Sequence, residues 1–439
     1  MIIIIFLWAL VSFAGLMYQG GSHIINIAAV LMVCLTGLII IKRGKDLGVI
    51  ALGLIISYVS ASILCAYAET GAWFSEANII ASLSGATVRN SSLAAAIMLS
   101  AYYSYNSLSN IVTLKGGISK SLNSLLLSAC CLISAMLSII LICINIKYGH
   151  PNDYNVDRFY YWEHIAPAWG EYVNFMSTQM AVFLGLAYGC RKSRMYLGIF
   201  LFSLLAQYMV GEKATGLYAS LLMFIIPLFI SRNIHLGTVI FKPRFVVASL
   251  IIVSALVCAI YLSYAAMGGE ENAIAMLLNR LVLQSQMWWT VDSISDGGIA
   301  YDGIKQAIFG GSDGISGIQY LMREVADPTT FAWFQDKGVN WTMASPANLT
   351  YLFGYGMAFI PAISIGVMFG ISSHIVVKAI VFKDVILIFL SIKLYNGVWQ
   401  AATMGNIDSL LSMKILFVLV VTVFYIIASR IIPRDYAIR

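Results

Sequence analysis

The most informative stretch of the chain is Glu270–Asp296, which reads EENAIAMLLNRLVLQSQMWWTVDSISD. It opens the largest hydrophilic break in a chain that is otherwise almost continuously apolar. Arg280 and Gln284 are four residues apart, so we expect them to share one face of a helix. The helix itself is predicted to be amphipathic because apolar residues recur at spacings of three and four: Ile274, Leu277, Leu278, Leu281 and Val282.

Two interpretations of this stretch remain open. The pair Trp288 and Trp289 follows the helix directly. A cation, an amide and flat aromatic surfaces at a membrane boundary suit a phosphorylated lipid that carries sugars. The alternative is a helix that lies on the bilayer surface, anchored by its arginine and tryptophans.

The composition places the whole chain in a membrane. Of its 439 residues, 60% are hydrophobic and only 10% are charged, whereas a soluble domain has about 25% charged residues. We therefore predict an all-α, polytopic integral membrane protein with a single transmembrane domain over residues 1–439. Its modest net charge of +6 gives no indication of nucleic-acid binding, and no nucleic-acid partner is predicted.

About twelve transmembrane helices are predicted from apolar runs of about 20 residues. They lie near 2–18, 24–41, 48–68, 90–112, 123–146, 173–190, 195–210, 214–231, 245–266, 347–372, 385–403 and 411–429. Alternate gaps and the C-terminal tail hold 16 of the 26 basic residues but only three of the 20 acidic residues, Asp46, Asp384 and Asp435. The positive-inside rule therefore places both termini in the cytoplasm.

Two long loops are predicted on the opposite, external side, about 147–172 and 267–346. Structureless loops of more than about 15 residues are unusual, so both are expected to carry short helices. Together they contain six of the nine tryptophans, an asymmetry that favours aromatic platforms at an external site over a simple interfacial belt. These six are Trp162, Trp169, Trp288, Trp289, Trp333 and Trp341.

The first loop combines residues suited to acid–base chemistry and phosphate binding. Arg158, Glu163 and His164 lie within seven positions, interleaved with aromatic residues. Carboxylate and imidazole groups are the usual general bases, and arginine is the usual binder of phosphate oxygens. The alternative is a solvated loop whose local ion pairs contribute little stability.

Two lysines are further candidates. Lys213, in the sequence GEKATG, is expected at a tight external turn, either reaching a phosphate or paired with Glu212. Lys393, Asn396 and Gln400 form one polar stripe on a predicted span. Ionisable groups at such a depth usually face a bundle interior or a wet cavity, so the stripe is expected to line an internal cavity.

A metal site and a cofactor are not predicted. The acidic residues of the second loop are scattered, without the spacing of metal ligands or a histidine among them, and are expected on a solvated surface. They are Asp292, Asp296, Asp302, Asp313, Asp327 and Asp336. The seven cysteines all lie in apolar segments, so neither a disulfide framework nor a zinc site is indicated.

The pattern of about twelve spans, one large and one smaller external loop, and an arginine in each resembles the O-antigen polymerases of Gram-negative bacteria (the Wzy family). These membrane glycosyltransferases of the GT-C type are similar in architecture to the O-antigen ligases. Family members have functional arginines in two periplasmic loops, each followed by a glycine. Here Arg158 precedes Gly170, Arg280 precedes Gly297, and Lys213 takes the arginine's place in a Gly-Ser-Arg turn.

The resemblance implies glycosyl transfer on the periplasmic face of the bacterial inner membrane. A glycan on undecaprenyl diphosphate would move onto another lipid-linked repeat unit, with a chain-length regulator protein as a further partner. Arg280, Arg158 and Lys213 would hold the diphosphate, with Gln284 and Lys393 as further substrate-binding residues. Glu163 or His164 would be the general base, and Trp162, Trp288 and Trp289 would stack on sugars, without a metal.

Other functions remain as alternatives. An O-antigen ligase is expected to have a histidine in the large loop, and this loop has none. A lipid-linked oligosaccharide flippase would share the spans and the intramembrane lysine, but needs no eighty-residue external loop and is expected to show an internal repeat. A membrane O-acetyltransferase would need histidines near the membrane that are less isolated than His23, His235 and His374.

Overall fold

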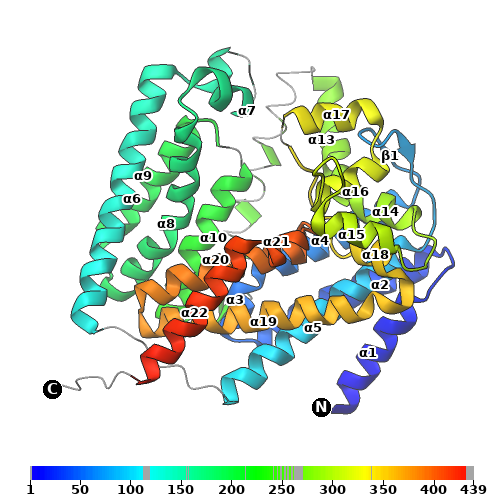
Figure 1. Ribbon diagram of the computed structural model, residues 1–439, viewed down its shortest axis with the longest axis horizontal. Coiled ribbons are helices and arrows are strands. Elements are labelled where there is room, and N and C mark those ends of the chain that lie inside the picture. Colours follow the sequence, from blue (N-terminus) through cyan, green and yellow to red (C-terminus); the bar gives the residue numbers. More distant parts are fainter. Residues whose placement is uncertain are drawn as a thin grey trace. The chain divides into compact units, whose positions relative to one another are not determined.

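The chain is mostly helical, which confirms the predicted all-α class (Figure 1). The computed structural model describes residues 2–111, 119–154, 156, 158–212, 214–240, 242–244, 246–247, 250–251, 254, 257–258, 261, 270–337 and 339–431. Within these residues the only strands are β1 (Trp73–Phe74) and β2 (Ile79–Ile80), which pair antiparallel in a short hairpin. The predicted span 245–266 lies largely outside the described residues.

Two compact units make up the chain. Unit 1 comprises Met1–Val112, Leu236–His374 and Lys393–Leu419, and unit 2 comprises Thr113–His235, Ile375–Ile392 and Val420–Arg439. Each unit is described by itself below. The single domain predicted over 1–439 stays a prediction.

Unit 1 begins with α1 (Ile2–Leu16), α2 (His23–Arg43), α3 (Asp46–Ile50), α4 (Leu52–Ala68), the β hairpin and α5 (Ala86–Ile111). After α11 (Leu236–Val239), a run of short elements follows: α13 (Glu270–Val282), the 3₁₀ turn η3 (Leu283–Ser285), α14 (Gln286–Ser293), α15 (Tyr301–Phe309), α16 (Gly317–Val325), α17 (Pro328–Asp336) and α18 (Ala347–Met357). The prediction that the loop 267–346 carries short helices is confirmed.

Unit 2 is built on α6 (Lys120–Tyr148), α8 (Trp169–Arg191), α9 (Arg194–Met209) and α10 (Ala214–Ser231). Between α6 and α8, the loop 147–172 carries η1 (Pro151–Tyr154), α7 (Arg158–Tyr160) and the π-helical turn η2 (Tyr161–Ile165), again as predicted. Buried apolar residues of α6, η2 and α9 form a core under this loop: Leu141, Ile144, Tyr161, Trp162, Ala166, Ala206 and Val210.

Three helices contribute residues to both units: α19 (Phe359–Phe382), α20 (Val385–Thr403) and α22 (Met413–Ile431). The short helix α21 (Asp408–Leu411) precedes α22 in unit 1. The predicted span 347–372 is not one continuous helix, because α18 ends at Met357 before α19 begins, and Gly354 inside α18 adopts φ +72° and bends the chain there. A Cβ atom at Gly354 would lie 2.5 Å from the carbonyl oxygen of Gly297, so the chain needs glycine at this bend.

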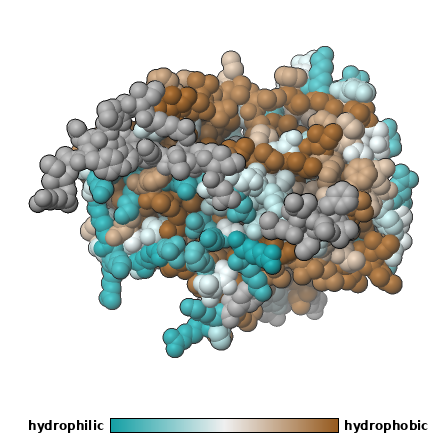
Figure 2. Space-filling view, turned by 90° about the horizontal axis from the view of Figure 1, so that it is seen from below, coloured by the Kyte–Doolittle hydropathy of each residue, from teal (hydrophilic) through white to brown (hydrophobic). Residues whose placement is uncertain are grey.

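Four helices among the described residues are long and apolar enough to cross a membrane: His23–Arg43, Lys120–Tyr154, Phe359–Phe382 and Val385–Thr403. Three shorter apolar helices add to them: Leu52–Ala68, Gly216–Ser231 and Met413–Ser429. Hydrophobic residues cover broad areas of the face drawn in Figure 2, and such areas mark surfaces that contact lipid or protein. The count of twelve spans and their orientation stay predictions.

Close packing of α19 against α5 explains two glycines within unit 1. Cβ atoms at Gly366 and Gly370 would lie 2.3 and 2.4 Å from the backbone oxygens of Ile97 and Ala101. Small residues four apart let two helices approach in this way in membranes. Ser104 adds a hydrogen bond from its hydroxyl to the Val367 carbonyl, 3.3 Å long.

We expect Gly366→Ala to destabilise the protein by about 1–3 kcal/mol, the usual cost of overpacking. The backbone of α5 would have to move, and this outweighs alanine's better helix propensity of about 1 kcal/mol. The measurement is the thermal unfolding midpoint in detergent. Gly198→Ala in α9 is the matched control, because nothing lies within 4 Å of its Cβ position. Equal midpoints for the two variants would contradict the packing described.

Candidate functional site

Arg280 lies near the end of α13, beside a carboxylate that the sequence patterns did not single out. Its guanidinium is 59% exposed, and Nη1 is 3.5 Å from Oε1 of Glu76. Glu76 belongs to the turn of the β1–β2 hairpin, and its side chain is only 18% exposed. Nε2 of Gln286, the first residue of α14, donates to Oε2 of Glu76 at 2.6 Å. These three side chains form the Glu76 cluster.

The position of Glu76 changes its acid–base behaviour. Burial raises the pKa of the Glu76 carboxyl, because the charged form loses hydration. The hydrogen bond from Gln286 and the positive charge of Arg280 act in the opposite direction but do not cancel the shift. A carboxyl whose pKa is raised, next to an exposed cation, is suited to accept a proton.

The hairpin and α13 are joined by a second contact, from Asn279 Nδ2 to Ser75 Oγ at 3.2 Å. Gln284 does not occupy the place expected from the spacing. The α-helix ends at Val282, so Gln284 lies in η3, where its Oε1 accepts from Thr342 Oγ1 at 3.3 Å. Gln286, not Gln284, provides the amide that contacts Glu76 alongside Arg280.

The amphipathic character predicted for α13 is present, but most of its apolar stripe is exposed. Ile274, Leu278 and Leu281 are 58%, 46% and 45% exposed. These positions, spaced by four and three residues, share one helix face. Among residues 273–282 of the helix, Ala273 and Val282 are the buried ones. The exposed stripe therefore forms an apolar surface on α13, suited to a bilayer or an acyl chain.

The tryptophans expected as sugar platforms divide into two groups. Trp162, Trp288, Trp289 and Trp341 are 4%, 0%, 5% and 5% exposed. Nε1 of Trp288 donates to the Ser345 carbonyl, and Nε1 of Trp289 donates to the Ser82 carbonyl, both at 2.9 Å. We correct the expectation accordingly: these rings are core residues, because large aromatic surfaces gain most from burial when their N–H groups find partners. Trp169 and Trp333 remain as exposed rings.

Asp292 was expected on a solvated surface, and this expectation is wrong because the residue is buried. It forms an ion pair with Arg89 of α5, and both are under 4% exposed. Arg89 Nε donates to Asp292 Oδ1 at 3.0 Å, and its Nη2 donates to the Ser84 carbonyl at 3.0 Å. The guanidinium also lies 4.7 Å from the ring centre of Tyr355. The pair thus links α5 to α14 inside unit 1.

Glu69 extends this buried polar network at the start of α5. Its Oε1 accepts from the Ser84 hydroxyl at 2.9 Å and from the Ala86 backbone N–H at 3.1 Å. Oε2 accepts from Asn26 Nδ2 of α2. A carboxylate at a helix N-terminus is stabilised by the unpaired N–H groups there. The network joins α2, α4, α5 and α14, which indicates a structural role.

Asp292→Asn is expected to destabilise unit 1 by about 3–5 kcal/mol, because it leaves a buried arginine without its counter-charge. The measurement is the unfolding midpoint and the yield of monodisperse protein. Asp336→Asn, at an exposed position, is the matched control. The double variant Arg89→Met/Asp292→Leu removes both charges and is expected to recover much of the loss. A single variant as stable as the control would refute this role.

In unit 2 a second cluster contains Arg158. Nη1 of Arg158, on α7, lies 2.5 Å from Oε1 of Glu212, which follows α9. Asn174 of α8 donates to the other carboxylate oxygen of Glu212. The exposed fractions of the Arg158 and Glu212 side chains are 32% and 9%. The carboxylate therefore fixes a half-exposed arginine at one edge of the unit.

The two candidate bases of the first loop are exposed. His164 Nδ1 is 3.8 Å from Glu163 Oε2, with 51% and 72% of their side chains exposed. The His164 ring also stacks on Tyr160, with ring centres 4.3 Å apart. Lys213 lies outside the described residues, and its expected pairing with Glu212 stays a prediction.

Close packing and backbone conformation explain the glycines that follow the two arginines, Gly170 and Gly297. A Cβ atom at Gly170 would lie 2.4 Å from the Trp162 ring, and Gly297 adopts φ +78° beside Tyr355.

Lys393 and Asn396 of α20 are partly buried and Gln400 is exposed; the internal cavity expected beside them stays a prediction. Within the described residues, no group of three or more His, Cys, Asp or Glu side chains is placed to hold a metal.

Comparisons with known proteins give one partial match. Residues 312–419 match the model of a family of unknown function (DUF6418), which covers the region from the turn after α15 to the start of α22. No curated protein matches the chain. No solved structure matches it either.

Proposed function

We propose that this chain is a polysaccharide repeat-unit polymerase, a metal-independent membrane glycosyltransferase that uses glycans on undecaprenyl diphosphate. The observation that carries the proposal is the Glu76 cluster at the end of α13, a helix that also bears an exposed apolar stripe. An exposed guanidinium suits a diphosphate, the raised pKa of Glu76 suits a general base, and the apolar stripe suits a polyprenyl chain. A lipid-linked sugar donor combines these three chemistries.

In the proposed reaction, a hydroxyl oxygen of the acceptor sugar attacks the anomeric carbon of the donor glycan. The bond from that carbon to the diphosphate oxygen breaks as the new glycosidic bond forms, and undecaprenyl diphosphate leaves. Arg280 stabilises the charge on the leaving diphosphate. Glu76 accepts the proton of the attacking hydroxyl.

Substrate binding would strengthen this base. When Arg280 turns from Glu76 to a diphosphate, the carboxylate loses a positive neighbour and gains a negative one. Both changes raise the pKa of Glu76 further. Glu76 is therefore proposed as the base in place of Glu163 and His164, whose side chains are exposed. Arg158, with Glu212 and Asn174, is proposed as a separate phosphate-binding group.

The setting of the reaction belongs to the same proposal. The chain would lie in the inner membrane of a bacterium, with both termini in the cytoplasm and the loops 147–172 and 267–346 in the periplasm. The acidic and tryptophan-rich loops and the basic opposite gaps support this orientation. A chain-length regulator protein would be a partner in the membrane.

A silver-stained lipopolysaccharide gel from a strain that lacks this gene tests the proposal. We expect a core band that carries a single repeat unit, while the ladder of longer chains disappears. That result means that export continues and polymerisation fails. Loss of every band that carries a repeat unit would instead identify a flippase or a ligase, and an unchanged ladder would exclude all three functions.

A further inference from the structure

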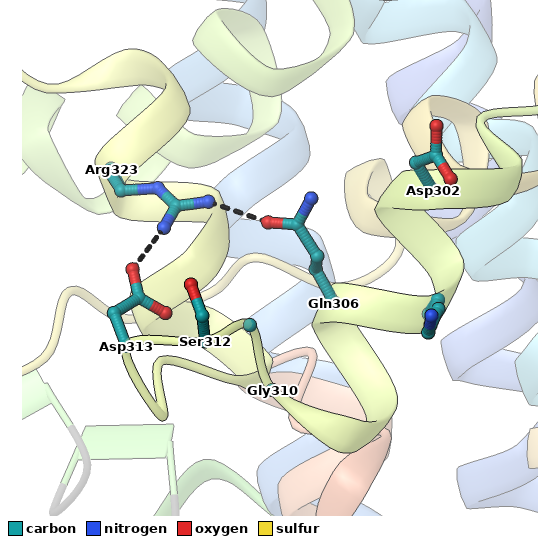
Figure 3. Close-up of a pocket in the computed structure, with 8 residues that line it drawn as sticks. Asp302, Gln306, Gly310, Ser312, Asp313 and Arg323 are labelled. Atoms are coloured by element: carbon teal, nitrogen blue, oxygen red, sulfur yellow. Dashed lines mark hydrogen bonds and ion pairs between the residues drawn. The ribbon is translucent and has the colours of Figure 1, made fainter.

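A polar pocket of about 330 Å³ lies within unit 1, between α15, α16 and the turn that joins them. It has no part in the reaction described above. Figure 3 shows side chains from all three segments directed toward the same space. The pocket is lined by Asp302, Lys305, Gln306, Gly310, Gly311, Ser312, Asp313 and Arg323. Its volume lies at the lower end of the range of about 300–1,000 Å³ for small-molecule sites.

One wall of the pocket is fixed by Arg323. Its Nη1 lies 2.6 Å from Asp313 Oδ2, and its Nη2 donates to Gln306 Oε1 at 2.8 Å. These bonds hold the turn and both helices in one arrangement. The amide nitrogen of Gln306 points away from Arg323 (Figure 3), so it can donate to a ligand.

The turn keeps the floor of the pocket free of bulky side chains. Gly310 and Gly314 adopt φ +80° and +74°, which favour glycine. The Gly311 N–H donates to the Ile315 carbonyl at 3.3 Å, which closes the turn. Ser312 adds a hydroxyl at the rim (Figure 3), a group that both donates and accepts hydrogen bonds.

The charges of the lining residues balance. The lining contains two carboxylates, Asp302 and Asp313, and two cations, Lys305 and Arg323. A site for a phosphate or another strong anion would have an excess of cations. A balanced set of donors and acceptors, with an amide and a hydroxyl, suits an uncharged ligand with many hydroxyl groups.

Two exposed aromatic rings lie on the same face of α15 as the pocket residues. Tyr301 and Phe309 are 75% and 78% exposed. Tyr301, Lys305 and Phe309 are spaced by four residues, so they follow one another along one helix face. The flat ring of an aromatic residue packs well against the C–H face of a sugar, while polar groups alongside bond to its hydroxyls.

We propose that this pocket, with Tyr301 and Phe309 at its edge, binds a sugar residue of the glycan chain. The pocket would then be the acceptor-binding subsite of the polymerase, an assignment that rests on the proposed function. Saccharide binding itself needs no catalysis, so it is measurable separately. The pocket would hold the glycan by hydroxyl hydrogen bonds and stacking.

The test uses the full chain, purified in detergent, and the polysaccharide released by mild acid from the lipopolysaccharide of the encoding strain. Saturation-transfer NMR titrations give the dissociation constant. Gln306→Ala and Phe309→Ala are each expected to weaken binding by about tenfold, equivalent to about 1.4 kcal/mol. Gln335→Ala on α17 and Phe417→Ala on α22 are the matched controls, because both positions are exposed, and neither lines the pocket.

Three results would overturn the assignment. The unaltered chain does not bind the polysaccharide, the pocket variants bind as tightly as the controls, or equimolar inorganic phosphate displaces the glycan and so identifies an anion site. The gel of the deletion strain separates this test from the proposed function. If the deletion strain loses the ladder but the pocket variants bind the polysaccharide as tightly as the controls, only the pocket assignment fails. If the deletion strain keeps the ladder but the pocket variants bind the polysaccharide more weakly, only the proposed polymerase function fails.

Discussion

Arg280→Ala is expected to reduce polymerisation by at least about 100-fold while the protein level stays normal. Removing one preorganised group that stabilises developing negative charge typically costs about 2.7–4 kcal/mol in the transition state. Arg280 is more than half exposed and has a 3.5 Å ion pair with Glu76, so its loss costs little folding energy. The measurement is the length of the lipopolysaccharide ladder in a deletion strain that carries the variant.

Two further variants sharpen this test. Arg280→Lys keeps the charge but loses the planar fork that binds two phosphate oxygens, so a shortened ladder is expected. Lys147→Ala removes an exposed cation at the end of α6 and should leave the ladder unchanged. A full ladder with Arg280→Ala at normal protein level would rule out its role in binding the diphosphate.

Glu76→Gln is expected to reduce the transfer rate by about 10²–10⁴-fold, the usual contribution of a general base. The change also alters the pH dependence. A base acts in its ionised form, and burial raises the pKa of Glu76. The rate of the unaltered chain should therefore rise with pH through an interval above the ordinary glutamate range. Glu76→Gln should lose this rise.

Glu163→Gln provides the matched control for the base. Its side chain is 72% exposed, and it is a glutamate of the other unit. We expect this variant to keep both the rate and the rising limb of the pH profile. If Glu163→Gln loses the rise and Glu76→Gln keeps it, Glu76 is not the base.

Hydropathy alone predicted most of the helices. Apolar runs located α2, α6 and α20 closely, because a membrane-spanning helix has a length fixed by the bilayer. The long hydrophilic loops were correctly expected to hold short helices. The bend at Gly354 was missed, since it depends on a close approach to Gly297, and apolar composition contains no signal of that contact.

The candidate site was only partly predictable. The spacing of apolar residues identified α13 and Arg280, but Glu76 lies some 200 positions earlier, in a hairpin with two-residue strands. No local pattern links the two. The same holds for Arg89 and Asp292, which are 203 residues apart. Trp288 and Trp289 were expected to stack on sugars or to anchor the helix at the bilayer surface, yet both are buried and hydrogen-bonded to the distant Ser345 and Ser82 carbonyls.

The most direct measurement is glycan transfer by the purified chain in lipid vesicles. The substrate is undecaprenyl-diphosphate-linked repeat units, and the reaction is run with a metal chelator and, in parallel, with added divalent metal. We predict a ladder of lipid-linked products for the unaltered chain, and single repeat units only for Arg280→Ala and Glu76→Gln. If the unaltered chain forms no ladder from intact substrate, or forms it only with added divalent metal, the proposed metal-independent polymerase is contradicted.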